Sequence, residues 1–277
     1  MLYKVTRIWA IIVLLSVQAF AKTYDYISIS KPFLNKTPIA VTSFKAFSGH
    51  EAEVITGVKG EQILKAGLDF TGYLKVMDPM AFLSNPAKSG IQLGEINFKD
   101  WTGIGAELLV TAGIEESNGQ IKLQLRLMDT FNTKLLVGKV YTGPSTQLRA
   151  MIHRFCAEVA KALTGNFGVF GSKIAFVSTV NGNKEIFSCD FDGFNPRQIT
   201  NHKTISLSPA WSYNGQWLAY VSYAKGKPDI FIKNINNNLG AVVNYAGINI
   251  SPDWMPGKLD LAATLSFSGN QEIYLLT

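Results

Sequence analysis

Hydrophobic and polar residues alternate strictly in the stretch "QIKLQLRLMD", residues 120–129. The four aliphatic residues from Ile121 to Leu127 fall on one face of an extended chain, and the residues between them are polar. This period of two predicts an antiparallel strand with one buried face. The preceding pair Asn118-Gly119 predicts a tight hairpin turn, because both residues tolerate a positive φ.

Helical periods lie on both sides of this strand. Residues 51–72 repeat apolar side chains at roughly helical intervals and finish on Gly72, which predicts a helix with a glycine stop. Residues 147–163 predict a second helix with one apolar face. The apolar positions are Val54, Val58, Ile63, Leu64 and Leu68 in the first helix, and Leu148, Met151, Ile152, Phe155, Val159 and Leu163 in the second.

Short apolar runs complete the first half of the chain. The runs "PIAVTSF" and "YLKVMDP" predict buried strands, and a short helix is expected around Trp101, ahead of three strands. Residues 22–165 therefore predict an α+β domain, a mixed sheet with helices on one face. The glycine-rich residues 166–171 predict a linker.

From Ser172 onward the chain shows no helical period and repeats itself. The stretches "KIAFVS", "WLAYVS" and "DLAATLS" begin 44 and then 43 residues apart, and "EIFSCD", "DIFIKN" and "EIYLLT" follow at the same steps. The phrase Ser-Pro-x-Trp also occurs twice, ending at Trp211 and Trp254. A period of this length with several short strands per unit is typical of β-propeller blades.

The residues of each repeat suit a blade. The run "WLAYV" is apolar on both faces, as an inner strand packed between two neighbouring sheets requires. Trp211 and Trp254 are large enough to fill the space between blades, and Asn214-Gly215 predicts a tight turn. Pro209 and Pro252 are expected to end the loops that enter the inner strands.

The array of repeats is expected to be incomplete. Residues 172–277 hold about two and a half blades, and propellers generally need four or more to close. The first unit lacks the Ser-Pro-x-Trp strand, so another part of the chain is expected to supply it. The fold class predicted is thus the α+β domain followed by an incomplete all-β propeller, in a C-terminally truncated chain.

The N-terminus has the pattern of an export signal. Lys4 and Arg7 precede an apolar run, and Ala19-Phe20-Ala21 is a small-x-small cleavage pattern, so residues 1–21 predict a signal peptide. An uncleaved anchor is the alternative. With cleavage, no membrane span is expected in the mature chain.

Net charge and cysteine positions bear on two further questions, nucleic-acid binding and a disulfide. The net charge of +6 is spread without a run of basic residues, so nucleic-acid binding is not indicated. Cys156 and Cys189 fall in different predicted domains, which favours two buried thiols over a disulfide, although export would permit one.

Motifs for catalysis are missing from the sequence. It contains no G-x-S-x-G nucleophile elbow and no phosphate-binding loop. Its three histidines, His50, His153 and His202, are far apart, and His153 with Cys156 offers two ligands where a structural metal takes four. The sequence therefore predicts neither an enzyme nor a cofactor or metal site.

With these parts in order, the chain resembles the TolB family, the periplasmic proteins of the Tol-Pal cell-envelope system. The run "LTGNFGVFGSKIAFV" is the most specific match, because it joins this α/β domain to a first blade. The other resembling stretches are "DWTGIGAELLVTAGI", "IKLQLRLMD", "LRAMIHRFCAEVAKALTGNFGVFGSKIAFVS", "SPAWSYNGQWLAYVS" and "SPDWMPG".

The resemblance implies a monomeric, non-enzymatic scaffold that supports outer-membrane integrity and envelope constriction at cell division. In the family, the mouth of a six-bladed propeller binds the lipoprotein Pal, and the extreme N-terminal segment engages the inner-membrane protein TolA. The partner-binding candidates that this implies are Lys22, Thr23, Tyr24, Asp25, Tyr26 and Ile27 for TolA, and Thr204, Ser206, Ile248 and Asn249 for Pal.

Two other functions fit the sequence. The chain is alternatively the propeller portion of a secreted prolyl oligopeptidase-like hydrolase, in which case downstream sequence would carry a nucleophile elbow. A third, weaker hypothesis is glycan recognition by exposed aromatic residues such as Tyr213 and Tyr223.

Overall fold

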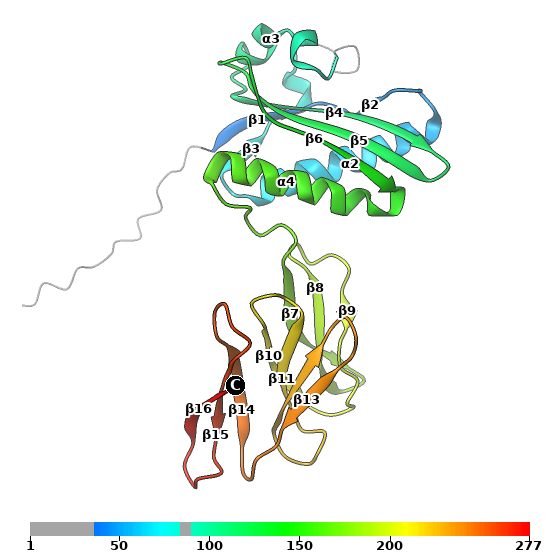
Figure 1. Ribbon diagram of the computed structural model, residues 1–277. Helices are drawn as coiled ribbons and strands as arrows, with labels where there is room; N and C mark the ends of the chain where they lie inside the picture. The colour runs from blue at the N-terminus through cyan, green and yellow to red at the C-terminus, as the bar shows by residue number, and fades with distance from the viewer. Residues whose placement is uncertain (1–35, 84–89) are drawn as a thin grey trace, which may run out of the picture. The chain divides into compact units, whose positions relative to one another are not determined.

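The first part of the chain folds into a mixed sheet. The computed structural model describes residues 36–83 and 90–277, and within these ranges the sheet has six strands in the order β3-β1-β4-β5-β6, with β2 beside β4 (Figure 1). β1 pairs in parallel with β3 and β4, whereas β4, β5 and β6 pair antiparallel. The strands are β1 Thr37–Val41, β2 Lys45–Ala46, β3 Leu74–Val76, β4 Leu108–Ser117, β5 Gln120–Asp129 and β6 Lys134–Pro144.

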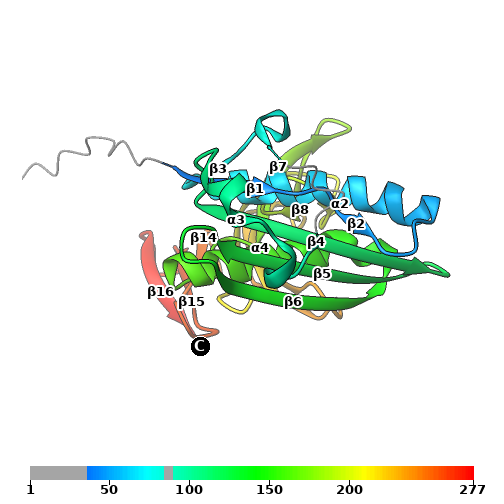
Figure 2. The same ribbon diagram turned by 90° about the horizontal axis from the view of Figure 1, so that it is seen from above.

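The long hairpin β4–β5 forms where the sequence predicted it. Asn118 and Gly119 make the turn with φ of 52° and 73°. The aliphatic residues from Ile121 to Leu127 are all buried, as the alternation requires. Seen from above in Figure 2, β4, β5 and β6 run side by side as the longest strands of the sheet.

Two long helices cover one face of this sheet, α2 Glu51–Phe70 and α4 Leu148–Thr164 (Figure 1). The predicted apolar face of α4 packs into the main core, with Phe155 fully buried against strand residues such as Leu123. Gly165, with φ 82°, takes the left-handed conformation at the end of α4. The prediction for α4 is therefore confirmed.

The apolar pattern of α2 was misinterpreted in part. Val54 and Val58 are 50% and 53% exposed, although the helical period placed them in the core. The buried face instead carries glycines: a Cβ on Gly60 would lie 2.7 Å from the ring of Phe44. Because glycine has no side chain, the helix can lie close against Phe44, and this close approach replaces the expected valine packing.

The opposite face of the sheet has a smaller cover. Trp101 in α3 is 2% exposed and packs with Leu109 and Met128, which point away from the main core. This addition to the predicted layers comes from α3 Phe98–Thr102 and its neighbours η1 Pro79–Ala81 and η2 Leu93–Glu95, while η3 Ser145–Gln147 leads into α4.

The second part of the described chain consists of three antiparallel sheets, one for each repeat. Their strand orders are β7-β8-β9, β10-β11-β12-β13 and β14-β15-β16. The fold class predicted from the sequence, an α/β part followed by a partial propeller, is confirmed. The strands are β7 Lys173–Val180, β8 Asn183–Asp190, β9 Arg197–Gln198, β10 Ser206–Trp211, β11 Trp217–Ser222, β12 Asp229–Asn234, β13 Gly240–Val243, β14 Asn249–Trp254, β15 Leu261–Leu265 and β16 Glu272–Leu276.

Neighbouring blades bury apolar faces against each other. One cluster joins Ile186 of the first blade to Leu218 and Tyr220 of the second, and another joins Val221 of the second to Leu265 of the third. The middle strand β11 is buried along nearly its whole length. Its counterpart β7 leaves many of its residues exposed, because within the described residues no sheet covers its other face.

The two prolines of the repeat lie inside strands, not at the ends of loops as predicted. Pro209 is in β10 and Pro252 is in β14, each at a break in the register with the neighbouring strand. The preceding Ser208 and Ser251 have φ of 51° and 53°. A bulge tolerates proline because the extra residue there makes no ladder hydrogen bond.

The predicted domain boundary can be compared with the end of α4 and the start of β7. α4 ends at Thr164 and β7 begins at Lys173, while Lys36–Thr277 form one compact unit by their contacts. The division into domains 22–165 and 172–277, with a linker at 166–171, stays a prediction. The expected signal peptide, residues 1–21, lies outside the described residues.

Candidate functional site

The loops that enter β10 and β14 lie at one end of the propeller part. The backbone N–H of Tyr223, just after β11, donates to the oxygen of Ile205 at 3.0 Å, and Ser266 N–H donates to the oxygen of Ile248 at 3.1 Å. Each entry loop is therefore tied to the turn that follows the next strand of its blade. We call this the mouth end, formed by residues 203–206, 223–228, 245–248 and 266–271.

The four residues predicted to contact Pal lie at or beside this end, in two different settings. The side chains of Ser206 and Asn249 are fully buried. Ser206 Oγ donates to Ser222 Oγ at 3.2 Å, and Asn249 Nδ2 donates to Asp229 Oδ1 at 3.1 Å. Thr204 and Ile248 are half-buried and keep part of their surface exposed. Partner contact by any of the four stays a prediction.

Large apolar side chains are exposed around the mouth end. Ile205, Tyr223, Tyr245 and Phe267 are 43%, 39%, 50% and 46% exposed, and we call these four the apolar rim. The rings of Tyr245 and Phe267 lie 5.2 Å apart between centroids. Exposed aromatic side chains of this kind are enriched in protein interfaces, and especially among the residues that dominate binding energy.

Sequence reasoning missed most of the apolar rim. Tyr223 and Phe267 both lie just after the middle strands of their blades, but the step of 43 residues pairs Tyr223 with Ser266, so the repeat alignment indicates these turns and not which of their side chains are aromatic. Tyr245 lies in a loop whose conformation has no sequence signal. Tyr213, the other aromatic residue considered for glycan binding, is 59% exposed but belongs to the β10–β11 turn at the opposite end.

His202 lies beside two aromatic rings, Tyr220 and Phe231, that stack on each other. Its Nε2 is 3.0 Å from the hydroxyl of Tyr220, and its ring centroid is 5.0 Å from that of Phe231. Burial lowers the pKa of His202, although the nearby Glu185 carboxylate opposes the shift. Burial and the same carboxylate raise the pKa of Tyr220 to about 12. Both groups are thus uncharged at neutral pH, which suits packing between blades.

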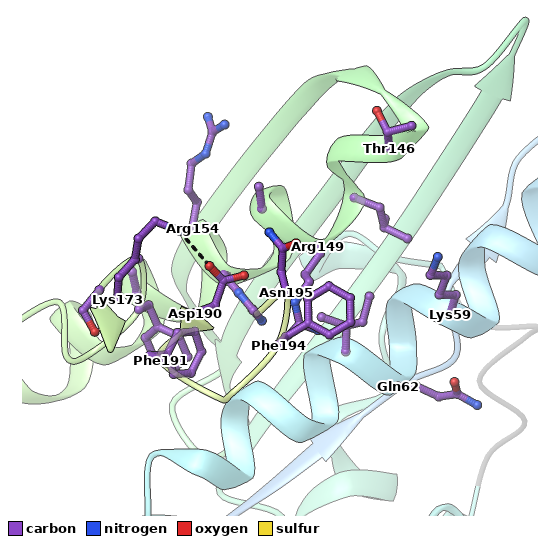
Figure 3. Close-up of a pocket in the computed structure, with 18 of the residues that line it drawn as sticks. Lys59, Gln62, Thr146, Arg149, Arg154, Lys173, Asp190, Phe191, Phe194 and Asn195 are labelled. Carbon is purple, nitrogen blue, oxygen red and sulfur yellow. Dashed lines mark hydrogen bonds and ion pairs between the residues drawn. The ribbon is translucent and has the colours of Figure 1, made fainter. Parts of the chain in front are cut away.

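A second candidate site is a cavity of about 790 Å³ beside α4 (Figure 3). Lys59 and Gln62 of α2 lie on one side of it, and Phe194 and Asn195 of the β8–β9 turn lie on another. Both helices and the first blade contribute to its lining, together with the segment that connects α4 to β7.

Two ion pairs lie at this cavity. The Arg149 guanidinium pairs with the Asp192 carboxylate and lies 4.1 Å above the centre of the Phe194 ring. Lys173 Nζ lies 3.0 Å from Asp190 Oδ1, the interaction dashed in Figure 3. The first pair joins α4 to the first blade, and the second lies within that blade.

His153 adds a titratable group to the same contact. Its Nε2 is 3.9 Å from Asp192 Oδ2. Burial lowers the pKa of His153, and the Arg149 cation lowers it further, while Asp192 and Asp190 oppose the shift. Burial pushes the pKa of Asp192 upward, but hydrogen bonds from the Phe194 backbone and Arg149 outweigh it and lower that pKa.

Phe191, which is 6% exposed, lies at the centre of the contact between α4 and the first blade. Its ring lies edge-on to three others at centroid distances of 5.1 Å to Phe70, 5.2 Å to Phe170 and 4.9 Å to His153. Aromatic pairs in this geometry add to the stabilisation from area burial alone. The cavity beside α4 is thus best explained as part of a structural joint.

Neither site brings a metal-binding cluster together in the part of the chain that the structure describes. Within residues 36–83 and 90–277, no group of three or more His, Cys, Asp or Glu side chains is placed to hold a metal ion. Cys156 and Cys189 are buried and free, and burial raises the pKa of Cys156 to about 12. A thiol with so high a pKa is a poor nucleophile.

The predicted TolA-binding segment is not part of this picture. Lys22, Thr23, Tyr24, Asp25, Tyr26 and Ile27 lie outside the described residues. Among the residues that are described, no helix has the length and apolar character needed to cross a membrane.

Comparison with known families finds two matches in succession along the chain. The TolB amino-terminal domain matches residues 25–136, and the TolB beta propeller domain matches residues 160–277. The Tol-Pal system protein TolB of Desulfosudis oleivorans is 50% identical over 268 residues, which cover 97% of this chain and 61% of that protein. The protein TolB homolog of Chlorobaculum tepidum is 36% identical over 252 residues, covering 91% and 56%.

A solved structure shows the same fold. The crystal structure of TolB from Acinetobacter baumannii superposes with a TM-score of 0.73 at 23% identity, covering 87% of this chain and 57% of that chain. The chain thus spans about 56% to 61% of the length of the two relatives named above.

Proposed function

Since the chain belongs to the TolB family, we propose that it is a non-enzymatic periplasmic scaffold of the Tol-Pal system, binding Pal at its propeller mouth and TolA through its N-terminal segment. In this role it supports outer-membrane integrity and envelope constriction at division. Its work is done by protein surfaces, and no cofactor takes part.

The apolar rim is the observation that carries the Pal part of the proposal. Its aromatic residues come from the turns of two successive blades and gather at one end, with Lys203 and Lys227 beside them. Aromatic anchors flanked by polar and charged residues are typical of protein-binding surfaces. Thr204 and Ile248, predicted from the sequence, would contribute to the edge of such a surface.

The TolA part rests on the sequence of residues 22–27. The segment alternates Tyr24, Tyr26 and polar residues just beyond the expected cleavage site after Ala21. A segment with this pattern can add a strand to the edge of a partner sheet, where backbone hydrogen bonds give affinity. Export through the signal at residues 1–21 would place both partners within reach.

The test uses the purified full chain and titrates it with Pal. Tyr245→Ala and Phe267→Ala are expected to weaken binding about tenfold or more, because each removes an exposed aromatic anchor. Tyr213→Ala is the matched control, since Tyr213 is 59% exposed at the opposite end, and its affinity should stay within about twofold.

Two results would count against the proposal. Absence of Pal binding by the unaltered chain would remove the Pal part, and an equal loss for Tyr213→Ala would show that the mouth end is not the surface used. Deletion of residues 22–27 should abolish TolA binding and leave Pal binding intact. Retained TolA binding after this deletion would exclude the segment.

A further inference from the structure

An acidic residue recurs at one position of the propeller repeat. Glu185, Asp229 and Glu272 begin the phrases "EIFSCD", "DIFIKN" and "EIYLLT", 44 and then 43 residues apart. In the first two blades this carboxylate is buried, with 2% of Glu185 and 1% of Asp229 exposed. A buried carboxylate is costly unless it is paired and hydrogen-bonded, so its partners indicate why it is retained.

Glu185 of the first blade is bonded by the loop that enters the second blade. Its Oε1 accepts from the backbone N–H of Lys203 at 2.8 Å, and its Oε2 accepts from Thr200 Oγ1 at 2.5 Å. Thr200 Oγ1 also accepts from the backbone N–H of Ile186 at 2.8 Å. One carboxylate thus fixes both ends of the turn 200–203, just before Thr204 and Ile205 of the mouth end.

Asp229 of the second blade does the same for the loop that enters the third. Its Oδ1 accepts from Asn249 Nδ2 at 3.1 Å and pairs with Lys227. Lys227 Nζ and Asn249 Nδ2 each donate to the backbone oxygen of Tyr245, both at 2.9 Å. The buried charge of Asp229 therefore holds the backbone that carries the exposed Tyr245 ring.

The two networks use different residues for the same connection. One joins a carboxylate to a backbone N–H and a hydroxyl, and the other joins it to an amide and an ammonium group. In both, the acid of one blade is bonded to the entry loop of the next, and that loop carries a residue of the apolar rim, Ile205 or Tyr245. General blade cohesion would not require the bonds to gather on the entry loops.

We propose that Glu185 and Asp229 are positioning residues, which fix the entry loops of the following blades so that the apolar rim is preorganised for a protein partner. This inference rests on the proposed function for the identity of the partner, Pal. Preorganisation raises affinity because loops already held in place lose less conformational entropy on binding.

The test replaces each acid by its amide in the full chain, as Glu185→Gln and Asp229→Asn. In Glu185→Gln, one of the two carboxylate oxygens that accept from the Lys203 N–H and Thr200 Oγ1 is lost. Hydrogen exchange of the Lys203 backbone amide should therefore accelerate about tenfold to a hundredfold. Asp229→Asn removes the carboxylate that pairs with Lys227. Hydrogen exchange of the backbone amides of residues 245–248 should therefore accelerate by a similar factor. Each variant should also weaken Pal binding about tenfold.

Control variants separate positioning from general stability. Glu115→Gln removes a carboxylate from the exposed ion pair with Lys122, 45% exposed on both sides, and should change neither readout. The amide of Ile230, buried in β12, should exchange as in the unaltered chain in both test variants. If Glu185→Gln does not fold, Thr200→Val replaces it, with Thr200→Ser as the conservative variant that keeps the hydroxyl.

The outcomes are separable from those of the proposed function. If the unaltered chain does not bind Pal, the proposed function fails, and the exchange measurements still decide whether the acids hold the loops. Unchanged exchange at Lys203 and at residues 245–248 would overturn the inference. So would a rise of the same size at Ile230, because that would show general destabilisation.

Discussion

The indole Nε1 of Trp254 donates a hydrogen bond to the backbone oxygen of Ala210 at 3.1 Å, which ties the third blade to β10 of the second. Trp211 occupies the same position one repeat earlier, 43 residues back. Its Nε1 is buried and has no partner among the described residues. The first blade, β7-β8-β9, has no counterpart of β10 within these residues to offer the carbonyl.

This difference predicts unequal costs for the same substitution. Trp254→Phe breaks a buried hydrogen bond and leaves the Ala210 oxygen without its donor, so it should lower the free energy of unfolding by about 1 kcal/mol more than Trp211→Phe. Both changes remove similar apolar area, so the pair controls for packing. Urea unfolding of the two variants measures the difference, and an equal or larger cost for Trp211→Phe would refute the prediction.

The loop that enters the third blade depends on a glycine. Gly247 has φ of +78°, and a Cβ there would lie 2.4 Å from Ser266 Oγ, which accepts the Ile248 N–H at 2.7 Å. Gly247→Ala should therefore destabilise the protein by about 2 to 3 kcal/mol, from backbone strain plus the clash.

Gly226 is the matched control for this change. It has φ of +86° with open space where a Cβ would stand, so Gly226→Ala should cost about 1 kcal/mol from strain alone. Thermal unfolding of both variants tests the prediction, which fails if Gly226→Ala is as costly as Gly247→Ala.

The aromatic joint between α4 and the first blade predicts a second contrast, within one turn. Phe191 is 6% exposed and contacts Phe70, Phe170 and His153, so Phe191→Ala should lower the free energy of unfolding by about 3 to 4 kcal/mol. Phe194 is 55% exposed, and Phe194→Ala should cost about 1 kcal/mol or less. Comparable losses in chemical denaturation would show that Phe191 is not the centre of the joint.

His153 makes stability depend on pH near neutrality. Its pKa is lowered in the folded protein by burial and by Arg149, so the unfolded chain binds the proton more readily. The free energy of unfolding should therefore fall as the pH decreases below about 7, through the ordinary histidine pKa of about 6.5. Asp192 has a lowered pKa and loses its contribution only at more acidic pH, below about 4.

His153→Gln removes this proton uptake. As the pH is lowered from 7.5 to 5.5, roughly the range in which histidine titrates, the unaltered chain should lose more stability than the variant. The free energy of unfolding of the variant, relative to that of the unaltered chain, should therefore increase over this range. His202, whose pKa is also lowered, remains and preserves part of the pH dependence. The check is urea unfolding at both pH values. A stability difference between variant and unaltered chain that does not change with pH would contradict the assignment.

The repeats were predictable because they are physical copies. Each blade buries apolar strands on both faces, so "KIAFVS", "WLAYVS" and "DLAATLS" keep their pattern along the chain. The alternation in β5 and the apolar face of α4 were equally clear, since one buried face imposes one period.

The helix α2 shows where such reasoning failed. A search for a hydrophobic period includes Val54 and Val58 and ignores Gly57 and Gly60. In the structure, Phe44 packs against the two glycines, which are buried, and the two valines are exposed. Close backbone approach depends on the position of a distant aromatic ring, which no local pattern records.

The sequence indicated the loops of the mouth end but not which of their side chains are exposed. Ser206 and Asn249 lie at the expected end, but both side chains are buried. Ser206 is hydrogen-bonded within its own blade, and Asn249 is hydrogen-bonded to Asp229 of the preceding blade. Which side chain of a loop points outward depends on these long-range bonds. Tyr245 is exposed because the network around Asp229 holds its backbone, and that network joins residues about 20 apart in sequence.

Site-specific photo-crosslinking in cells tests the central claim most directly. A benzophenone amino acid replaces Tyr245 at the mouth end or, separately, Tyr213 at the opposite end of the propeller part. We predict a crosslink to Pal from position 245 and none from position 213. A crosslink from position 213 alone, or none from either position while Pal is present, would contradict the account.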